Sequence, residues 1–390
     1  MRPSGQRSSQ TGSPITSRTV HGREKGVSEL HFEHESLPQR VCFASGEARA
    51  MLARVVARLK GSRVMVIASA RDADRATQIT ADLPVVHRHT EVAMHVPVQT
   101  AKRARAAAGE HDVDVLVCLG GGSAIGLAKA IALTTGIPIV AVPTTYAGSE
   151  ATTVWGLTED GHKTTGVDPR VLPWAVIYDA ELTMSLPVPM SVASGLNAVA
   201  HCMDSMWGPR ADPIDRAVAQ EGIRALSIGL PQIVADPGGL GGREQVLYGA
   251  YLAGVAFSSA GSGLHHKICH VLGGTYNLPH AQTHAVVLPY VLAFNTPAAP
   301  EAANRIATAL GSTDALDGLQ ELRQRLGAPK ALRDYGFDAS NIDAAGAAIL
   351  SVVPNNNPRP VTTGDLHRLL YGAWQGTDPT TITYDTESRR

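Results

Sequence analysis

The sequence predicts an α/β domain over residues 29–185 followed by an all-α domain over residues 186–390. Three observations lead to this fold class. Short apolar runs alternate with helical stretches from about residue 38 to residue 180, the pattern of a parallel sheet covered on both faces. Strand signals fade after Leu186-Pro187 and helical periodicity replaces them. The length of 390 residues also exceeds the usual size of one hydrophobic core.

Runs of apolar and β-branched residues mark the strands of the first domain. Arg63–Ser69 (RVMVIAS) and Val113–Leu119 (VDVLVCL) are almost wholly apolar, as expected of interior strands in a parallel sheet. A hairpin is predicted around Glu159-Asp160-Gly161. The remaining predicted strands are Arg40–Phe43, Pro84–His87, Ile137–Val142, and the hairpin strands Thr153–Leu157 and a short partner near Lys163.

Helical patterns fill the spaces between these strands and most of the second domain. In the first domain the predicted helices begin at about Asp72 and cover Thr100–Gly109 and Ala124–Leu133. In the second domain they are Pro189–Trp207, Asp215–Leu230, Glu244–Ser258, His265–Leu272, Glu301–Leu310 and Gly364–Trp374. A cleft between the two domains is the expected place for an active site.

The composition is that of a soluble globular protein with no affinity for nucleic acid or membrane. Apolar residues make up 44% and charged residues 18%, and the formal net charge of −1 leaves no overall basic surface for nucleic acid. No apolar run approaches the roughly 20 residues of a membrane helix. Four dispersed cysteines without a Cys-x-x-Cys pair predict reduced, mostly buried thiols and a cytoplasmic location: Cys42, Cys118, Cys202 and Cys269.

Residues 1–28 differ from the rest of the chain, being rich in Ser, Arg, Gly and Thr, with Glu24 as the first acidic residue. An Arg- and Ser-rich, acid-poor start resembles an organellar transit peptide. Its prolines and glycines leave no clear amphipathic face, however, so a disordered extension is the expectation.

A glycine loop, Gly120-Gly121-Gly122-Ser123, follows one apolar strand and precedes a helix. The backbone N–H groups of such a loop can approach a diphosphate, and the helix N-terminus adds partial positive charge. A tight turn that needs glycine only for its conformation is the alternative. Glycines at 120, 122 and 126 do not match the dinucleotide-binding motif G-x-G-x-x-G, because the third glycine comes one position too late. The P-loop ending Gly-Lys-Ser/Thr is missing as well.

The next strand ends at Pro143-Thr144-Thr145, and ligands of doubly wound sheets collect at the carboxyl ends of strands. Both loops are therefore predicted to line one nucleotide site. The predicted cofactor-binding residues are Gly121, Gly122, Ser123, Thr144 and Thr145, with Ser69 at the end of an earlier strand. Lys163 is a candidate anion anchor, and a solvated surface lysine is the alternative.

Histidines concentrate between residues 265 and 280, where His265, His266, His270 and His280 occur within 16 positions. His266 and His270 are four residues apart and share one face of a helix, and Asn197 with His201 repeats this spacing upstream. Clustered imidazoles bind metal ions, hydrogen-bond anions or transfer protons. A single histidine on an apolar helix is more often structural, and we expect His284 to be a surface or supporting residue.

Taken together, these residues resemble the iron-containing, group III alcohol dehydrogenase family. The resemblance runs over about residues 36 to 375. The segments that carry it are Gly120-Gly121-Gly122-Ser123, Pro143-Thr144-Thr145, Ser185-Leu186-Pro187, the helix with Asn197 and His201, and the spacing His266, His270, His280. Three further segments resemble the maleylacetate reductase branch of that family: Leu37–Val41, His265–Gly274 and Asn357–Val361.

The resemblance implies a dehydroquinate synthase-like architecture, in which a dinucleotide-binding α/β domain and a helical domain hold NADH or NADPH and the substrate between them. Metal-dependent members bind Fe(II) or Zn(II) through one Asp and three His, and the matching positions here are Asn197, His201, His266 and His280. Because a neutral Asn is a poor ligand, a tightly bound metal is not expected, and His201, His266 and His280 are weak metal candidates. His270 matches a position near the nicotinamide.

The branch implies reduction of the carbon–carbon double bond of maleylacetate, a dicarboxylate, to 3-oxoadipate in the breakdown of aromatic compounds, by a cytoplasmic homodimer. The implied catalytic residues are Asn197, His201, His266, His270 and His280. Lys267 is a further candidate anion anchor. The alternatives are a metal-dependent primary alcohol or polyol dehydrogenase, against which Asn197 argues, and a dehydroquinate-synthase-like lyase, which needs a stronger metal site. A noncatalytic binding protein does not account for both the loop and the histidines.

Overall fold

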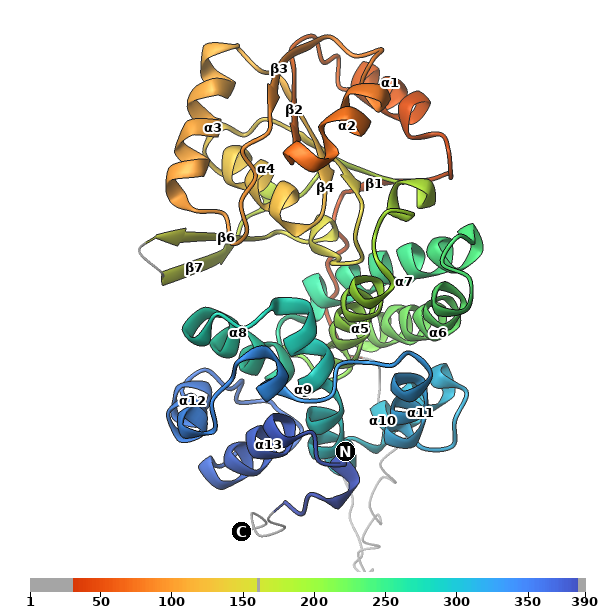
Figure 1. The fold of residues 1–390 in the computed structure, drawn as a ribbon, viewed down its shortest axis with the longest axis vertical. Helices are drawn as coiled ribbons and strands as arrows, with labels where there is room; N and C mark the ends of the chain where they lie inside the picture. Colours follow the sequence, from red (N-terminus) through yellow and green to blue (C-terminus); the bar gives the residue numbers. More distant parts are fainter. Residues whose placement is uncertain (1–30, 160–161, 385–390) are drawn as a thin grey trace, which may run out of the picture. The chain divides into compact units, whose positions relative to one another are not determined.

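Six parallel strands form the sheet of residues 40–178, which we call the sheet region (Figure 1). The computed structural model describes residues 31–159 and 162–384. Along the sheet the order is β1-β8-β5-β4-β2-β3, and every pairing is parallel. The strands are β1 Arg40–Phe43, β2 Val64–Ala68, β3 Val85–His89, β4 Val115–Gly120, β5 Ile139–Pro143 and β8 Ala175–Tyr178.

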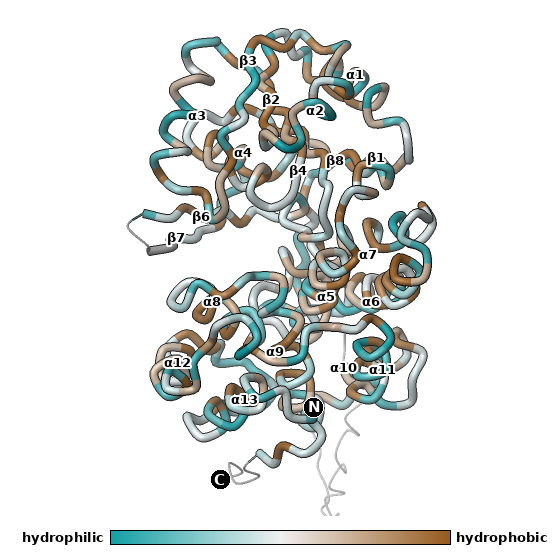
Figure 2. Tube along the Cα trace, in the orientation of Figure 1, coloured by the Kyte–Doolittle hydropathy of each residue, from teal (hydrophilic) through white to brown (hydrophobic). Residues whose placement is uncertain are grey.

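Helices cover both faces of this sheet because the side chains of each strand alternate between the faces. Val64 and Val66 of β2 pack on the side of α1 and α2, whereas Met65 and Ile67 pack on the side of α3 and α4. Figure 2 shows hydrophobic residues along β2 and hydrophilic ones on α2. The helices are α1 Ala48–Arg58, α2 Ala73–Ile79, α3 Val98–Glu110 and α4 Gly122–Thr135.

The direction of the crossovers reverses between β2 and β4. The chain passes from β2 to β3 towards one edge, and from β4 through β5 to β8 towards the other. In doubly wound sheets ligands bind at such a switch point, outside the carboxyl ends of the strands. The segments that begin at Ser69 and at Gly121 follow these two strands directly.

A separate antiparallel hairpin joins β6 (Val154–Glu159) to β7 (His162–Val167), as predicted. The predicted turn residues Asp160 and Gly161 lie outside the described residues. Lys163 pairs with Thr158 in the ladder, and its side chain lies outside the described part of the chain. Its predicted role as an anion anchor therefore stays a prediction.

Helices dominate residues 188–375, which we call the helical region (Figure 1). Two hydrophobic cores hold it together: α5, α6 and α7 pack with α9, α10 and α11, while α8 and α9 pack with α12 and α13. The helices are α5 Val188–Ser205, α6 Pro213–Ala235, α7 Leu240–Ala260, α8 Leu264–Tyr276, α9 His280–Asn295, α10 Pro300–Leu310, α11 Ala315–Arg325, α12 Ile342–Leu350 and α13 Thr363–Gln375. No helix in the described part of the chain has the length and apolar character to span a membrane.

The loop after β5 ties the sheet region to the helical region. The amide of Tyr146 donates to Ser194 Oγ on α5 at 3.1 Å. Gly148, which has a φ of +74°, lies against α7, and a Cβ on Gly254 would lie 2.5 Å from the Gly148 carbonyl oxygen. The predicted nucleotide loop is thereby attached to the helix that carries Asn197 and His201.

The buried Lys129 holds the chain that follows this loop, from Ser149 to Val154. Lys129 of α4 is 2% exposed, and burial lowers its pKa to about 7, while the nearby Glu150 carboxylate raises it. The protonated side chain has three N–H donors for the oxygens around it. Its Nζ donates to the carbonyl oxygens of Ser149 (2.7 Å), Thr152 (2.7 Å) and Val154 (2.8 Å) and to Thr152 Oγ1 (3.0 Å).

The predicted fold class is confirmed, but several elements were not predicted: α1, β8, α9, α11 and α12. His280 begins α9, a helix that was not predicted. That helix is buried nearly all round and contains Pro289, so it lacks an amphipathic period and carries a residue that usually breaks helices. Likewise α6 continues through Pro231, beyond its predicted end. Residues 1–28 lie outside the described residues, and the domain boundary at 185/186 and the cleft stay predictions.

Candidate active site

The glycine loop and the threonine loop lie against each other at the switch point of the sheet. Gly121 is the N-cap of α4, and a Cβ on it would lie 2.8 Å from Thr145 Cγ2. The amide of Thr144 donates to the Gly120 carbonyl oxygen at 3.1 Å. The absence of a side chain at Gly121 therefore lets the two predicted nucleotide loops pack together.

The first turn of α4 faces open space. Gly122 and Ser123 form this turn, and their N–H groups have no acceptor within the helix. A Cβ on Gly122 would meet no atom within 4 Å. Outward-pointing N–H groups at the positive end of a helix dipole, with room in front of them, suit a diphosphate.

Both signs of charge surround the end of β2. Ser69 Oγ donates to Asp72 Oδ2 at 2.7 Å, and Arg75 Nη1 donates to Ser185 Oγ at 3.0 Å. A carboxylate at this position suits the ribose hydroxyls of NAD, whereas a guanidinium suits the 2′-phosphate of NADP. Asp72, Arg75 and Ser185 border a pocket of about 290 Å³, which is lined by Arg71, Asp72, Asp74, Arg75, Gln78 and Ser185.

Imidazole rings from three helices form a buried histidine cluster, which consists of His201 of α5, His265 and His266 of α8, and His284 of α9. The rings of His201 and His266 stack with centroids 4.7 Å apart and an interplanar angle of 12°. His265 Nε2 and His284 Nδ1 are hydrogen-bonded at 2.9 Å. All four are buried, and His284 is 0% exposed, so the surface alternative for that residue is wrong.

Asn197 and Phe257 complete this buried cluster. Asn197 lies one turn before His201 on α5 and is 2% exposed. Its Oδ1, like His201 Nδ1 and His266 Nε2, is buried and makes no hydrogen bond within the described residues. The Phe257 ring lies 4.7 Å from that of His201 and 4.3 Å from that of His266. The Phe257 ring thus lies beside buried polar atoms that make no hydrogen bond within the described residues.

Burial lowers the pKa of every imidazole in the histidine cluster. Burial, together with a smaller effect of neighbouring histidines, lowers the pKa of His201 and of His265 to about 3. The pKa values of His266 and His284 also lie well below the ordinary value, mainly because of burial. The rings are therefore neutral at pH 7, and each offers one N–H donor and one lone pair. Such a cluster can hydrogen-bond a developing oxyanion without carrying net charge.

A carboxylate that sequence reasoning missed supports this cluster. Asp204, in the last turn of α5, is 0% exposed and accepts a hydrogen bond from His266 Nδ1 at 2.8 Å. Burial raises its pKa to about 6, while hydrogen bonds from the backbone of α8 lower it. Its position three residues after His201 was the available signal, because i and i+3 share a helix face. The same rule, at a spacing of four, joins His284 to His280.

His270 and His280 are exposed beside the buried rings. His270 lies one turn after His266, with ring centroids 6.0 Å apart, and the His280 ring is 4.4 Å from that of His284. The structure therefore brings together the histidines predicted from the sequence and Asn197, whose catalytic roles stay predictions. Lys267 of α8 is half-buried.

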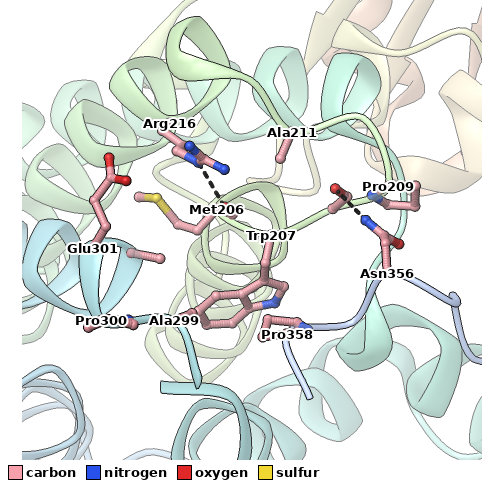
Figure 3. Close-up of a pocket in the computed structure, with 12 residues that line it drawn as sticks. Met206, Trp207, Pro209, Ala211, Arg216, Ala299, Pro300, Glu301, Asn356 and Pro358 are labelled. Carbon is pink, nitrogen blue, oxygen red and sulfur yellow. Dashed lines mark hydrogen bonds between the residues drawn. The ribbon is translucent and has the colours of Figure 1, made fainter. Parts of the chain in front are cut away.

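A second pocket of about 390 Å³ lies in the helical region and contains none of these histidines (Figure 3). Trp207 forms one wall, and the indole lies near Ala299, Pro300 and Pro358 in the close-up. Arg216 Nε donates to the Met206 carbonyl oxygen at 3.1 Å, and Asn356 Nδ2 donates to that of Gly208 at 3.1 Å. These hydrogen bonds occupy polar groups of the pocket wall, so we assign no chemistry to this pocket.

The candidate metal ligands in the histidine cluster include no carboxylate, and a group that does, His34 with Asp212 and Asp215, lies outside this cluster. In the described part of the chain, one group of close ligand atoms is His265, His266 and His284, with all three atoms within 4.8 Å of one another. Two of these atoms belong to rings that hydrogen-bond each other. Neither this group nor the family's set of Asn197, His201, His266 and His280 supplies a carboxylate, the ligand that adds charge to such a site.

The sheet with its predicted nucleotide loops and the helical region with its histidine cluster define a two-part dehydrogenase. The chain belongs to the iron-containing alcohol dehydrogenase family. The family model for iron-containing alcohol dehydrogenase matches residues 38–180, and that for the C-terminal part of the Fe-containing alcohol dehydrogenase family matches residues 191–374.

Relatives of the chain include maleylacetate reductases. That of Sphingobium indicum is 46% identical over 356 residues, which cover 90% of this chain and 100% of the relative. Among solved structures, an iron-containing alcohol dehydrogenase from Corynebacterium glutamicum is 61% identical with a TM-score of 0.90, covering 91% of this chain and 100% of that one. Maleylacetate reductase from a Rhizobium species is 40% identical with a TM-score of 0.86, covering 90% and 100%.

Proposed function

We propose that this chain reduces the carbon–carbon double bond of maleylacetate to give 3-oxoadipate, with NADH or NADPH as the hydride donor. The observation that carries the proposal is the neutral histidine cluster with Asn197 in place of a carboxylate, in a chain whose relatives include maleylacetate reductases. The substrate is a dicarboxylate with an enone, and its reduction places negative charge on the ketone oxygen. Neutral imidazole N–H groups stabilise that charge without a metal.

The coenzyme supplies a hydride to the alkene carbon β to the ketone. The π electrons of the alkene then move to form an enolate, and the carbon next to the ketone takes a proton, so that one hydride and one proton are added in total. His201 Nδ1 is buried without a hydrogen bond in the described residues and is the candidate donor to the ketone oxygen, beside the stacked ring of His266. The exposed His270 and His280 are placed to pass a proton from solvent or to hold a carboxylate.

We further propose that catalysis needs no tightly bound metal, because the available donor set lacks a carboxylate. Elemental analysis of the purified protein, followed by assay in EDTA, tests this. We expect less than stoichiometric iron and zinc and unchanged turnover in chelator. One metal ion per chain, with activity abolished by EDTA and restored by that ion, contradicts the proposal and favours the metal-dependent alcohol dehydrogenase alternative.

The product decides between reduction of the alkene and reduction of the ketone. Maleylacetate and NADH are incubated with the enzyme, and NMR identifies the product. We expect 3-oxoadipate, with the ketone intact and the alkene protons lost. A hydroxy acid that retains its double bond would assign the chain to the carbonyl reductases, and a panel of simple aldehydes in the same absorbance assay shows whether they compete as substrates.

A further inference from the structure

Asp204 connects the helix that carries His201 to the helix that carries His266. Besides the His266 ring, its carboxylate accepts hydrogen bonds from the backbone amides of Gly263 (3.1 Å), His265 (3.4 Å) and His266 (3.1 Å). These are N–H groups of the N-cap and first turn of α8, which otherwise lack acceptors. The N-cap itself, Gly263, has no side chain to satisfy them. Asp204 therefore caps α8 from a neighbouring helix.

The approach of this carboxylate depends on glycine. A Cβ on Gly263 would lie 2.5 Å from Asp204 Oδ1, closer than real Cβ atoms come to a neighbour. Any other residue at this position would push the carboxylate away from the N-terminus of α8. The pair Asp204 and Gly263 thus sets the place of α8, and with it the place of His266.

The hydrogen bond to the ring has a second effect, on the tautomer of His266. A carboxylate only accepts, so Nδ1 of the neutral ring carries the proton and Nε2 keeps its lone pair. That Nε2 is the buried atom without a hydrogen bond in the described residues, and its ring stacks on His201. The other tautomer would place a lone pair against the carboxylate and an N–H in the cluster.

We propose that Asp204 is a positioning residue of the active site: it fixes both the ring orientation and the Nδ1–H tautomer of His266, so that Nε2 faces the substrate. The kinetic part of this inference rests on the proposed reduction of maleylacetate, whereas the tautomer does not. In serine hydrolases, replacing the analogous Asp by Asn leaves the geometry intact and lowers turnover by about ten thousandfold.

The tautomer is measured directly in the unmodified enzyme by ¹⁵N NMR of histidine-labelled protein at pH 8, with the His266 signals identified by their loss in His266→Gln. We expect a protonated Nδ1 and an unprotonated Nε2. In Asp204→Asn, whose amide can also donate, we expect the Nε2–H tautomer to become populated. An Nε2–H tautomer in the unmodified enzyme overturns the proposal whatever the substrate proves to be.

Kinetics separate positioning from simple helix capping. Asp212 is a matched control, since it is a buried Asp that caps α6 and contacts a histidine, His34 Nδ1, at 2.7 Å, yet belongs to no part of the histidine cluster. We expect Asp204→Asn to lower kcat at least about a hundredfold while KM for NADH changes less than about threefold, and Asp212→Asn to leave both unchanged.

Equal losses in the two variants, or a kcat for Asp204→Asn within threefold of the unmodified enzyme, overturn the proposal. Thermal unfolding of both variants shows whether they fold. If Asp204→Asn does not fold, the tautomer of the unmodified enzyme still decides. Failure of the unmodified enzyme to reduce maleylacetate at all refutes the proposed function and leaves the tautomer result standing.

Discussion

Single residues in this site work by hydrogen bonding from neutral rings. Because burial keeps His201 and His266 uncharged, neither ring supplies positive charge to an anion, and His201 can hold one only through an N–H donor. Positive charge must come from groups nearer to solvent. The exposed His270 and His280 and the half-buried Lys267 are such groups. Neutral histidines inside the site and basic side chains nearer to solvent suit maleylacetate. This substrate carries a carboxylate at each end and gains negative charge on its ketone oxygen during reduction.

Removing one ring should therefore cost turnover more than binding. We expect His201→Ala and His280→Ala each to lower kcat for maleylacetate at least about a hundredfold, the usual loss for one donor to a developing oxyanion. We expect His266→Ala to lower kcat at least about a hundredfold as well, because it removes the ring that Asp204 positions. Steady-state kinetics measure this, with circular dichroism to confirm folding. His367→Ala is the control, because His367 is exposed on α13 and its ring contacts Asp343 of α12 and no histidine of the cluster. A variant that keeps more than a tenth of the kcat has no such donor role.

Arginines at the end of β2 should widen coenzyme choice. Since Arg71 and Arg75 border the pocket beside Ser69, we expect NADPH to be accepted as well as NADH, and Arg71→Ala to raise KM for NADPH about tenfold, or about 1.4 kcal/mol, without changing that for NADH. Arg54→Ala, an exposed change on α1, is the control. Asp72 opposes this effect, and a preference of the unmodified enzyme for NADH above about a thousandfold would show that its carboxylate dominates.

Residue spacing predicted part of the site and could have predicted more. The spacing of His266 and His270, and of Asn197 and His201, brought these residues together as helical geometry requires. Asp204 was overlooked because a single Asp in an apolar helix carries no motif of its own. Its role becomes apparent only when α8 is placed against α5, which is a tertiary contact.

At the scale of elements, the start of α4 makes a testable nucleotide site. Gly122→Ala adds a methyl group that meets no protein atom within 4 Å, so thermal stability should be unchanged or slightly higher. If the coenzyme diphosphate approaches this turn, the methyl group should instead raise KM for NADH at least about tenfold, or about 1.4 kcal/mol. Gly109→Ala, which is equally open but lies on α3, is the control. Unchanged coenzyme binding would place the diphosphate elsewhere.

Elements with a clear hydrophobic pattern were predicted from the sequence, and elements without one were missed. β2 and β4 are continuous apolar runs, and the hairpin strands flank a turn motif, so each was found. β8 was missed although β1, of the same four-residue length, was found, and α9 is buried nearly all round with Pro289 inside it. Packing against α5, α8 and α13 stabilises such a helix, and that stabilisation is absent from the local sequence.

For the whole molecule, the buried imidazoles predict loss of stability in acid. A His with a pKa near 6.5 when unfolded and about 3 when folded takes up a proton on unfolding between these values, so the free energy of unfolding falls as pH falls through this window. Asp204, with a raised pKa of about 6, acts in the opposite direction between about pH 4 and 6. Four cluster histidines outnumber it.

Urea unfolding from pH 4 to pH 6.5 measures this effect. Each neutral buried His contributes up to about 1.4 kcal/mol per pH unit to the slope. We therefore expect the double variant His265→Gln with His284→Gln to show a clearly shallower pH dependence than the unmodified protein, whatever its stability at pH 7. A double replacement of exposed histidines is the control, and equal slopes in the two proteins would mean that the cluster rings are already protonated when folded.

The side-chain nitrogen of Lys129 occupies the kind of oxygen-lined position that a bound metal cation takes in other proteins. Four oxygens surround its ammonium nitrogen at 2.7–3.0 Å, an arrangement in which backbone carbonyls replace a hydration shell, as they do around potassium ions. The activity of enzymes that bind such a cation from solution depends on the concentration of that cation. Here the amine is covalently attached to α4, the helix that begins at the glycine loop, so the segment from Ser149 to Val154 needs no cation from solution, and exchanging potassium for a bulky organic cation should leave turnover unchanged.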